Sequence, residues 1–566
     1  MPGFRQSLNA LRFCTLFLGG FLSLRAQDLF EISKQLELIH SVYKEIHLQY
    51  VDEPKPGALS KRAIDAMLSG LDPYSVLFTE EDIEEYRFLT SGTYGGIGVS
   101  FQEIQGKTRI TAVSENSPAH KAGIRVGDQL LVVNGIRLLH YNENVVALLR
   151  GSPGSTISIE VLPLGASQPV IHKLIRDEIK ASTLSVVKLL PDSITGLIRL
   201  SSFTDRCADE VQMAFQQLKR RGAKQLILDL RDNPGGLLTE AVKLVNVFVP
   251  KNILVVYTQG RNPELSNTFK TPQTATDTLM PLIVWVNKQS ASASEIVAGA
   301  LQDLDRALIV GERSYGKGLV QQTKPLPYNS QIKLTVAKYY IPSGRCIQAL
   351  DYSLNDAEGK VLSVADSLIR AFKTRNGRIV YDGAGILPDL VFNTPSSADM
   401  LLKFEAMPCF FEFCNRYFLN HPRIEPAEQF SLSPADMQLF KSMCTPGLDS
   451  LKTPLETQLS KNLAFSASGI VDSLSIINQI NQLQSLIKIE KNKWLDRYES
   501  GIKNALEESL VSRYYFEKGR IAYQLEHTQD LQTLLKLFAD SNGFKARLKP
   551  VPGEQPKRPF SVNKRY

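Results

Sequence analysis

The chain has 566 residues, a formal net charge of +7, 43% hydrophobic residues and 22% charged residues. This length exceeds what one hydrophobic core supports, so three or four domains are expected. The composition is that of a globular protein, and no dense basic stripe indicates nucleic-acid binding.

The N-terminus has the pattern of a secretory signal. Arg5 and Arg12 flank the start of an apolar stretch, Phe13 to Leu24, which is too short to span a bilayer comfortably. We predict that residues 1–26 are a signal peptide and that the protein is exported to the periplasm. The alternative is an uncleaved leader that leaves the protein associated with the membrane.

Residues 27–92 are expected to be helical. Apolar residues recur at spacings of three and four and would share one helix face: Leu36, Ile39, Val42, Tyr43 and Ile46.

Residues 93–165 change to short strands, glycine turns and one helix. The turn Tyr94-Gly95-Gly96-Ile97-Gly98-Val99 can direct several backbone N–H groups toward one point, which suits a carboxylate. Further motifs follow it in an order that resembles a PDZ domain: Ile110–Val113, Ser117-Pro118-Ala119, Ala122-Gly123-Ile124, Gly127-Asp128-Gln129-Leu130-Leu131, Val133-Asn134-Gly135 and Arg150-Gly151-Ser152-Pro153-Gly154.

The PDZ resemblance implies that a peptide C-terminus adds as a strand beside Val99–Phe101. The substrate-binding residues would be Gly96, Ile97, Gly98 and Val99, and a helix around Asn142–Leu149 would form the other wall. The alternative is a PDZ-like fold that only packs against the core or mediates oligomerisation.

Residues 166–395 alternate buried strand-like runs with helical runs, which predicts a parallel-rich α/β core. The expected elements are strands at Gly196–Leu200, Gln225–Leu230 and Leu282–Val286 and helices at Ala208–Arg220 and Leu237–Phe248.

The last of these strands is followed by Ser290-Ala291-Ser292-Ala293-Ser294-Glu295, which opens a small-residue helix. A serine at such a strand-to-helix turn is exposed, and the helix N-terminus favours a developing oxyanion. Ser292 with Glu295 equally fits a capping box, in which Ser292 is only a helix cap worth about 1 kcal/mol.

The segment Tyr315-Gly316-Lys317-Gly318 presents a lysine from a tight turn. A serine hydroxyl is a weak nucleophile unless a base takes its proton. Lysine can be that base only when it is neutral, which requires burial to lower its pKa. The hypothesis therefore requires Lys317 to be buried.

A third segment, Asn233-Pro234-Gly235-Gly236, follows a buried strand and precedes a helix. Gly235 and Gly236, together with Ala293, are candidates for donating N–H groups to an oxyanion. Taken alone, the segment would be only a tight turn.

In this order the motifs resemble the carboxyl-terminal processing (tail-specific) peptidases. The resemblance covers roughly residues 30–395 and includes Leu71-Asp72-Pro73-Tyr74, Tyr340-Ile341-Pro342-Ser343-Gly344-Arg345 and Gly385-Ile386-Leu387-Pro388-Asp389. It implies a ClpP/crotonase-like α/β core with an inserted PDZ domain, cleaving protein or peptide substrates that have exposed C-termini.

The same resemblance gives Ser292 as the nucleophile and Lys317 as the general base. Gln321, four residues on, would share a helical face with Lys317 and orient it. Arg150 would couple the position of the PDZ domain to the active site. The choice of Ser292 over Ser290 and Ser294 rests on the family's register.

Residues 396–566 form an extension beyond the minimal family pattern. Ile476–Ile489 and Leu506–Leu525 are amphipathic and predict helices, which could form a homodimer, cap the active site or recruit an adaptor. Five cysteines remain without the leader, and one bridge within the Cys409, Cys414 and Cys444 region is compatible with export.

No cofactor is predicted, because the histidines are scattered and no metal-ligand spacing occurs. Two other functions stay open. One is a PDZ scaffold whose protease core has lost activity, against which the complete motif set argues. The other is a Ser-His-Asp hydrolase, although no histidine lies near the three loops in sequence.

Overall fold

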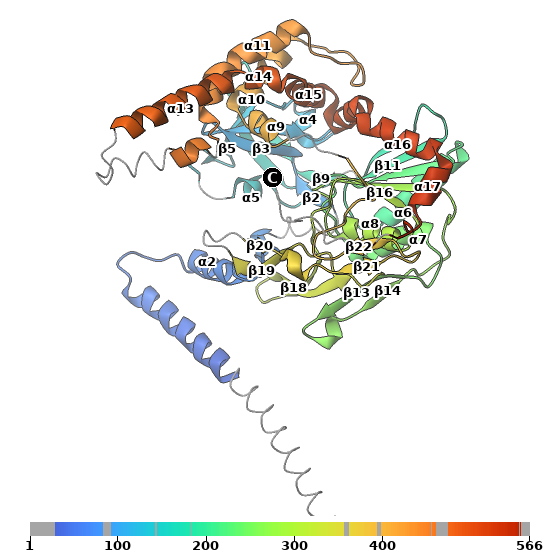
Figure 1. Ribbon diagram of the computed structural model, residues 1–566. Helices are drawn as coiled ribbons and strands as arrows, with labels where there is room; N and C mark the ends of the chain where they lie inside the picture. The colour runs from blue at the N-terminus through green and yellow to red at the C-terminus, as the bar shows by residue number, and fades with distance from the viewer. Residues whose placement is uncertain are drawn as a thin grey trace, which may run out of the picture. The chain divides into compact units, whose positions relative to one another are not determined.

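The computed structural model describes residues 29–82, 92–141, 144–180, 183–355, 361–392, 398–453, 455–459, 474–553 and 555 (Figure 1). They belong to two compact units that divide after Leu77. The predicted leader, residues 1–26, lies outside the described residues. Among the helices that are described, none combines the length and apolar character needed to cross a membrane.

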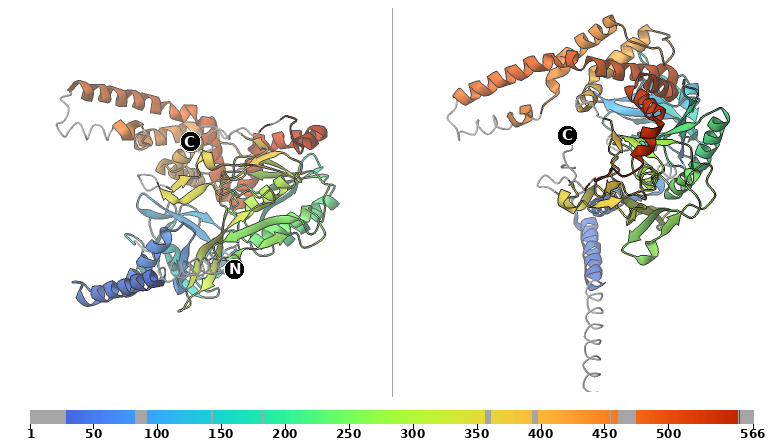
Figure 2. Two further views of the ribbon diagram at one scale, coloured as in Figure 1. Left: turned by 60° about the horizontal axis from the view of Figure 1, so that its bottom comes forward. Right: turned by 45° about the vertical axis from the view of Figure 1, so that its right-hand side comes forward.

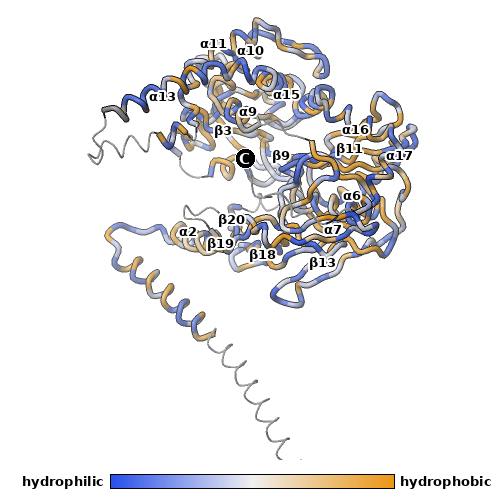
Figure 3. Tube along the Cα trace, in the orientation of Figure 1, coloured by the Kyte–Doolittle hydropathy of each residue, from blue (hydrophilic) through white to orange (hydrophobic). Residues whose placement is uncertain are grey.

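The first unit contains a helix at residues 29–49 and α2 (Pro56–Ser69). The predicted helix is therefore present. Its apolar face lies at the surface, since Leu36 is 62% exposed and Ile39 is 53% exposed. Apolar and polar segments alternate along this helix in Figure 3.

The second unit begins with an antiparallel sheet in the order β3-β4-β5-β7-β8, with β6 beside β5. Two short helices, α4 (Pro118–Lys121) and α5 (Val145–Leu149), accompany it. The strands are β3 (Val99–Ile104), β4 (Lys107–Val113), β5 (Gln129–Val133), β6 (Ile136–Arg137), β7 (Thr156–Leu162) and β8 (Val170–Ile175).

This sheet extends beyond residue 165, where the sequence placed the end of the PDZ domain, because β8 pairs along the length of β7. Outside the sheet, β2 (Thr93–Gly96) pairs antiparallel with β9 (Asp177–Lys180). The two ends of the module therefore leave it side by side.

The core is a six-stranded sheet in which β10 (Leu184–Leu189) is antiparallel to its neighbour and the other strands are parallel. The parallel strands are β11 (Thr195–Leu200), β12 (Gln225–Asp229), β15 (Leu282–Val286), β16 (Leu308–Gly311) and β23 (Leu390–Val391). The three predicted strands are thus confirmed within a residue or so, because strands buried on both faces read as continuous apolar runs.

Helices cover one face of this sheet. Ile198, Leu228 and Val284 point into a cluster formed with α6 (Cys207–Arg220), α7 (Leu238–Phe248) and α8 (Ala293–Asp303). The intervening residues of the strands face the other side, because side chains alternate along a strand.

That second face is covered by the C-terminal extension. Leu197, Ile227 and Ile283 pack with Leu534 and Phe538 in a separate apolar cluster. Leu534 and Phe538 belong to α16 (Gln529–Ala539), which is followed by α17 (Ser541–Arg547). Figures 1 and 2 show both helices beside the sheet. The extension is therefore part of the core packing.

A second sheet flanks the core, in which β18 pairs antiparallel with both β17 and β13, and β13 with β14. Two short hairpins, β19–β20 and β21–β22, follow it. The bounds are β13 (Leu254–Gly260), β14 (Thr268–Lys270), β17 (Leu319–Pro325), β18 (Gln331–Tyr340), β19 (Leu350–Asn355), β20 (Val361–Ser363), β21 (Ala371–Lys373) and β22 (Ile379–Tyr381).

The rest of the described extension is largely helical. The helix predicted at Ile476–Ile489 is present, whereas the one predicted at Leu506–Leu525 is broken at Phe516, whose φ of 57° and ψ of −160° are not helical. This part of the chain comprises α9 (Ala398–Glu405), α10 (Pro408–Asn420), α11 (Pro434–Cys444), α13 (Leu474–Asn492), α14 (Trp494–Arg497) and α15 (Glu499–His527). Cys409 and Cys444 form a disulfide with their Cα atoms 5.4 Å apart, while Cys414 stays a buried thiol.

Candidate active site

Ser292 lies in the turn between buried strand β15 and helix α8. Its backbone has φ 56° and ψ −113°, a left-handed conformation that is strained for a residue with a side chain. The Glu295 amide donates to the Ser292 carbonyl oxygen at 2.9 Å. The Glu295 carboxylate in turn accepts from the Ser292 amide at 2.8 Å, so the capping-box geometry that the sequence offered as an alternative is present at this helix start.

The three neighbouring serines differ in what their hydroxyls do. Ser290 is fully buried and donates to the carbonyl oxygen of Leu230 at 2.8 Å. Ser294 is also fully buried and donates to the carbonyl oxygen of Asn233 at 2.9 Å. Ser292 is only half-buried. The geometry therefore selects Ser292 as the accessible hydroxyl, a choice that sequence spacing alone left open.

A single buried carboxylate joins the Ser292 turn to the Lys317 turn. Glu295 Oε2 accepts from the amides of Ser292 at 2.8 Å and Lys317 at 2.9 Å. Its Oε1 accepts from the Gly316 amide at 2.7 Å and the Ser314 hydroxyl at 2.5 Å. Burial raises the pKa of Glu295, and these four donors oppose that shift.

Tyr339 on β18 adds a second tie between the same two turns. Its buried hydroxyl lies 2.7 Å from the carbonyl oxygen of Lys317 and 3.2 Å from that of Ser292. Burial raises the pKa of Tyr339 well above its ordinary value, so the phenol remains a donor.

The glycine pair lies directly against the serine turn. A Cβ at Gly235 would fall 2.8 Å from the Cβ of Ser292, and one at Gly236 would fall 2.3 Å from the Phe203 carbonyl oxygen. Both glycines also have positive φ, 98° and 143°. Glycine is therefore required at both positions by space and by backbone conformation.

The amides of this loop are not equivalent. Gly235 N–H donates to Asn233 Oδ1 at 2.9 Å, so it is already engaged. Within the described part of the chain, the amides of Gly236 and Ala293 donate no hydrogen bond. Of the three predicted oxyanion groups, Gly235 therefore shapes the loop, while the other two retain available donors.

Lys317 is presented by backbone contacts on both sides. Gly316 has φ 88° and its Cβ position is 2.3 Å from the Ala349 side chain, while Gly318 N–H donates to Gln348 Oε1 at 2.7 Å. The Lys317 residue itself is half-buried, which is less than the full burial that the sequence argument required.

The helical relation predicted between Lys317 and Gln321 is wrong. Lys317 lies in a turn, and Gln321 is in strand β17, beside a register shift that follows Val320. Gln321 Nε2 donates to Thr335 Oγ1 at 3.1 Å on the neighbouring strand. A spacing of four residues between two side chains does not by itself distinguish a helix from a strand.

The predicted peptide-binding loop lies at the start of β3, which is an edge strand of its sheet. The carbonyl oxygens of Ile97 and Gly98 accept from Ala119 at 3.0 Å and Ser114 at 2.8 Å. Within the residues described, the amides of Ile97 and Gly98 donate no hydrogen bond. Gly96 ends β2 and Val99 begins β3, so the four predicted residues form one continuous turn.

Arg150 lies at the C-terminal end of α5, with its guanidinium 5.0 Å from the centre of the Tyr94 ring. Tyr94 belongs to the β2–β9 ribbon at the boundary of the module.

A cavity of about 1160 Å³ opens between the PDZ sheet and the helical extension. Its walls include Gln102, Glu103 and Ile104 from the far end of β3 and Phe411 and Arg513 from α10 and α15.

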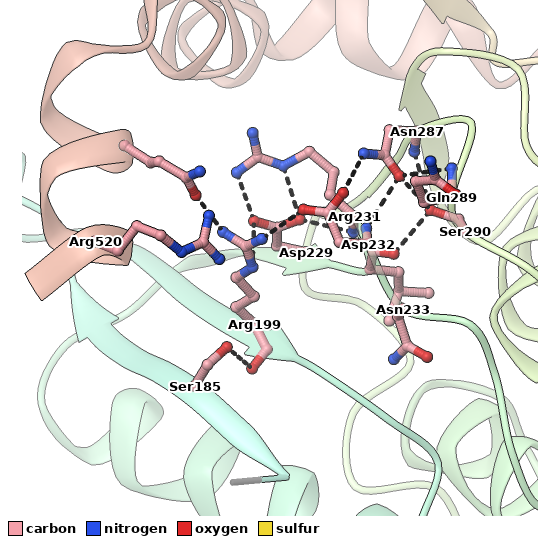
Figure 4. Close-up of polar contacts among 12 residues, drawn as sticks. Ser185, Arg199, Asp229, Arg231, Asp232, Asn233, Asn287, Gln289, Ser290 and Arg520 are labelled. Carbon is pink, nitrogen blue, oxygen red and sulfur yellow. Dashed lines mark hydrogen bonds and ion pairs between the residues drawn. The ribbon is translucent and has the colours of Figure 1, made fainter. Parts of the chain in front are cut away.

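A polar cluster supports the glycine loop from the carboxyl ends of the core strands (Figure 4). Arg231 binds both oxygens of Asp229, at 2.9 and 2.7 Å, and its guanidinium lies 3.4 Å from the centre of the Trp285 ring. Burial would raise the pKa of Asp229, but Arg231 and Arg199 outweigh that effect and lower it. In the described part of the chain, no three His, Cys, Asp or Glu side chains gather around a metal site.

Sequence reasoning missed the roles of Glu295 and Tyr339. Glu295 was considered only as a capping-box partner, because its contact with the Lys317 turn is tertiary. Tyr339 follows Ser292 by 47 residues, and no local pattern announces its contact.

Three parts of the chain match known protein families. Residues 194–353 match peptidase family S41, residues 109–163 match a PDZ domain, and residues 403–538 match a probable PDZ-protease C-terminal helical domain. Among solved structures, the photosystem II D1 C-terminal processing protease shares 29% identity, with a TM-score of 0.34 and coverage of 54% of this chain and 82% of that chain.

Two curated relatives give the same result. A carboxy-terminal-processing protease of Bartonella bacilliformis is 35% identical over 322 residues, covering 56% of this chain and 73% of the relative. The carboxy-terminal processing protease CtpA of Bacillus subtilis is 33% identical over 338 residues, covering 59% and 71%. The chain therefore belongs to peptidase family S41 and is a carboxy-terminal-processing serine protease with a PDZ domain.

Proposed function

We propose that this protease is an exported endopeptidase that cleaves peptide bonds with a Ser–Lys dyad in a ClpP/crotonase-like core. Ser292 is the nucleophile and Lys317 the general base. The observation that carries the proposal is the shared carboxylate of Glu295, which holds the Ser292 and Lys317 turns to each other.

The reaction is an acyl transfer. Lys317, as the neutral amine, takes the proton of the Ser292 hydroxyl as its oxygen bonds to the substrate carbonyl carbon. The amides of Gly236 and Ala293 stabilise the oxyanion. Lys317 then protonates the leaving amine as the carbon–nitrogen bond breaks, and water hydrolyses the acyl-enzyme.

The half-burial of Lys317 has a place in this proposal. A substrate chain lying over the turn removes water from the amine, which favours its neutral form. Gln321 is retained as a candidate for orienting the amine from β17.

Substrate capture belongs to the PDZ domain. A peptide C-terminus adds along the free edge of β3, with its carboxylate at the amides of Ile97 and Gly98. Its upstream residues then run toward Ile104, the end of the strand that borders the cavity. Arg150, whose guanidinium lies over the Tyr94 ring beside the β2–β9 pair, is the candidate for coupling peptide binding at the PDZ domain to the active site.

The Cys409–Cys444 disulfide supports export, because disulfides persist in oxidising compartments such as the periplasm. Cell fractionation and N-terminal sequencing test this: a mature N-terminus near residue 27 in the periplasmic fraction is expected, and an intact leader in the cytoplasm would contradict it.

The activity is tested by cleavage of an unstructured protein with an apolar C-terminus. Wild type should cut it, whereas Ser292→Ala and Lys317→Ala should be inactive while their circular dichroism spectra remain native. Ser167→Ala, at an exposed serine between β7 and β8, is the matched control. Folded dyad variants that still cut would exclude the Ser–Lys mechanism.

The PDZ step has its own test. A fluorescent peptide ending in apolar residues should bind wild type and lose affinity for Gly98→Trp, because even a Cβ at Gly98 would lie 2.4 Å from the Ser117 side chain. Equal binding by both proteins would show that the loop is not the carboxylate site.

A further inference from the structure

Arg199 is a buried cation that the mechanism does not use. It lies near the end of β11 with 4% of its surface exposed. By strand alternation it shares the sheet face of Leu197, which packs beneath the C-terminal helices. A buried guanidinium requires partners for its donors, so its contacts identify what it holds.

Its two short hydrogen bonds lead in opposite directions (Figure 4). Nη2 donates to Asp232 Oδ2 at 2.8 Å, and Nη1 donates to Gln524 Oε1 at 3.1 Å. Asp229 is farther away, 3.9 Å from Nε, and its carboxylate is already bound by Arg231. The Arg199 fork therefore bridges Asp232 and Gln524.

Asp232 belongs to the glycine loop, four residues before Gly236. Its backbone is left-handed, with φ 60°. Asn287 holds it reciprocally: Asp232 N–H donates to Asn287 Oδ1 at 3.0 Å, and Asn287 Nδ2 donates to Asp232 Oδ1 at 2.8 Å. Asn287 begins the turn that leads to Ser292. Asp232 is therefore the residue through which Arg199 reaches both loops of the active site.

Gln524 is held in one orientation on α15. Its Nε2 donates to Glu508 Oε2 at 2.6 Å, and Glu508 also pairs with Arg520 at 3.7 Å. A carboxylate can only accept and a guanidinium can only donate, so the amide oxygen of Gln524 must face Arg199. The flanking residues Ile521 and Leu525 are buried against the core sheet and fix this part of the helix.

We propose that Arg199 and Gln524 are positioning residues of the protease, through which the C-terminal helical domain holds the oxyanion loop in its catalytic conformation. Neither residue touches substrate. The inference rests on the proposed function, because it assigns the oxyanion to the Gly236 loop. The helical domain thereby becomes part of the catalytic apparatus, since an undocked α15 leaves Arg199, which holds Asp232, without its Gln524 partner.

The test uses the full chain with an internally quenched peptide that ends in apolar residues. Gln524→Leu removes both hydrogen bonds at nearly constant volume, and Glu526→Ala, on an exposed position of the same helix, is the matched control. We expect Gln524→Leu to lower kcat about 10-fold with KM unchanged, and to weaken binding of a peptide boronate, which mimics the oxyanion, by a similar factor.

A second variant guards against a folding defect. Arg199→Lys keeps the charge but cannot donate to Asp232 and Gln524 as a fork, so it should show an intermediate loss of kcat. Combining Gln524→Leu with Asp232→Asn should cost little more than Asp232→Asn alone, because the residues act in one chain.

The inference is overturned if Gln524→Leu matches Glu526→Ala in kcat and boronate affinity. It is also overturned if Gln524→Leu lowers only the melting temperature while the folded enzyme turns over normally. Failure of the proposed function gives a different result, because folded Ser292→Ala would then still cleave the peptide. That result would refute both the proposed function and the positioning role of Arg199 and Gln524.

Discussion

Glu295 accepts four hydrogen bonds from the two turns that carry Ser292 and Lys317. At the residue scale, the active site is thus assembled by an acceptor-only group at the point where backbone donors converge. Ser290 and Ser294 also connect neighbouring segments, but as hydrogen-bond donors. Their hydroxyls donate to carbonyl oxygens around the glycine loop. The proposed catalytic groups are thus placed by neighbouring residues that have no proposed role in the reaction.

Replacing Glu295 by Gln should abolish most activity. Either orientation of the new amide leaves its NH₂ group facing at least one backbone N–H that can only donate, so one turn must move away. We expect kcat on the quenched peptide to fall about 100-fold or more. Glu312→Gln is the control, because Glu312 accepts only a weak bond from Lys288 N–H at 3.3 Å. Normal turnover by a folded Glu295→Gln protein would refute this role.

The buried Asp229 carboxylate predicts that the stability of the fold depends on pH. Its folded pKa is lowered by Arg231 and Arg199 below the unfolded value of about 3.9. The stabilisation is therefore complete above that value and is lost as the pH falls through the folded pKa.

The melting temperature of Asp229→Asn should consequently lie furthest below wild type near neutral pH and approach it in acid. Asp205→Asn, at an exposed site, is the control and should melt close to wild type. If the difference in melting temperature between wild type and Asp229→Asn stayed constant across the pH range, the ionised Asp229 carboxylate would not be the stabilising group.

At the scale of elements, helix α8 is held at both ends. Its N-terminus carries Ser292, and its C-terminus meets two arginines, of which Arg345 belongs to the Tyr340–Arg345 motif. Fully buried Arg345 donates to Asp303 Oδ1 at 2.9 Å and to Gln302 Oε1 at 2.7 Å. Arg378 donates to the Gln302 carbonyl oxygen at 2.9 Å. These contacts therefore act on the candidate site from a distance, by fixing the helix that presents Ser292.

The disulfide joins α10 to α11 across 35 residues. Closing a loop of that length stabilises a fold by about 2–4 kcal/mol through the unfolded state. We expect reductant to lower the urea midpoint for unfolding of the helical domain in the wild-type protein. The double variant Cys409→Ser/Cys444→Ser should have this lowered midpoint both with and without reductant. Identical midpoints for oxidised wild type and the double variant would show that the bridge adds nothing.

At the scale of the whole second unit, the C-terminal extension connects the two functional modules. Toward the core, α16 and α17 close the second face of the parallel sheet. Toward the PDZ domain, Lys518 pairs with Glu115 at 3.0 Å and Phe516 packs edge-on against His120 with ring centres 4.8 Å apart. The α15 segment, which is kinked at Phe516, therefore contacts both the PDZ domain and the protease core.

Removing α16 and α17 should destroy the fold. A chain ending at residue 527 exposes the apolar face formed by Leu197, Ile227 and Ile283, and we expect it to aggregate. A chain ending at residue 553 keeps both helices and is the control. A milder variant, Leu534→Ala, should lose about 2–5 kcal/mol in urea unfolding. A soluble and active protein ending at residue 527 would contradict this account.

Much of the architecture was predictable because it depends on local patterns. The buried strand Leu282–Val286, the helix from Ala208 to Arg220 and the glycine turns each carry their own signal in a short window. The motif order likewise indicated Ser292, Lys317 and Gly236 as a set. Gln321 is the exception. Its spacing of four residues from Lys317 fits a helix or a strand, and the sequence pointed to a helix where the structure has strand β17.

The sequence by itself determined the element types, the motif set and the family, since each is written in neighbouring residues. The tertiary structure decided which serine is accessible, that Glu295 and Tyr339 join two turns, and that Gly235 has already used its amide. It also decided that Gln524 meets Arg199, 325 residues earlier in the chain. Burial and hydrogen-bond partners are set by which distant segments pack together, and no local window contains that information.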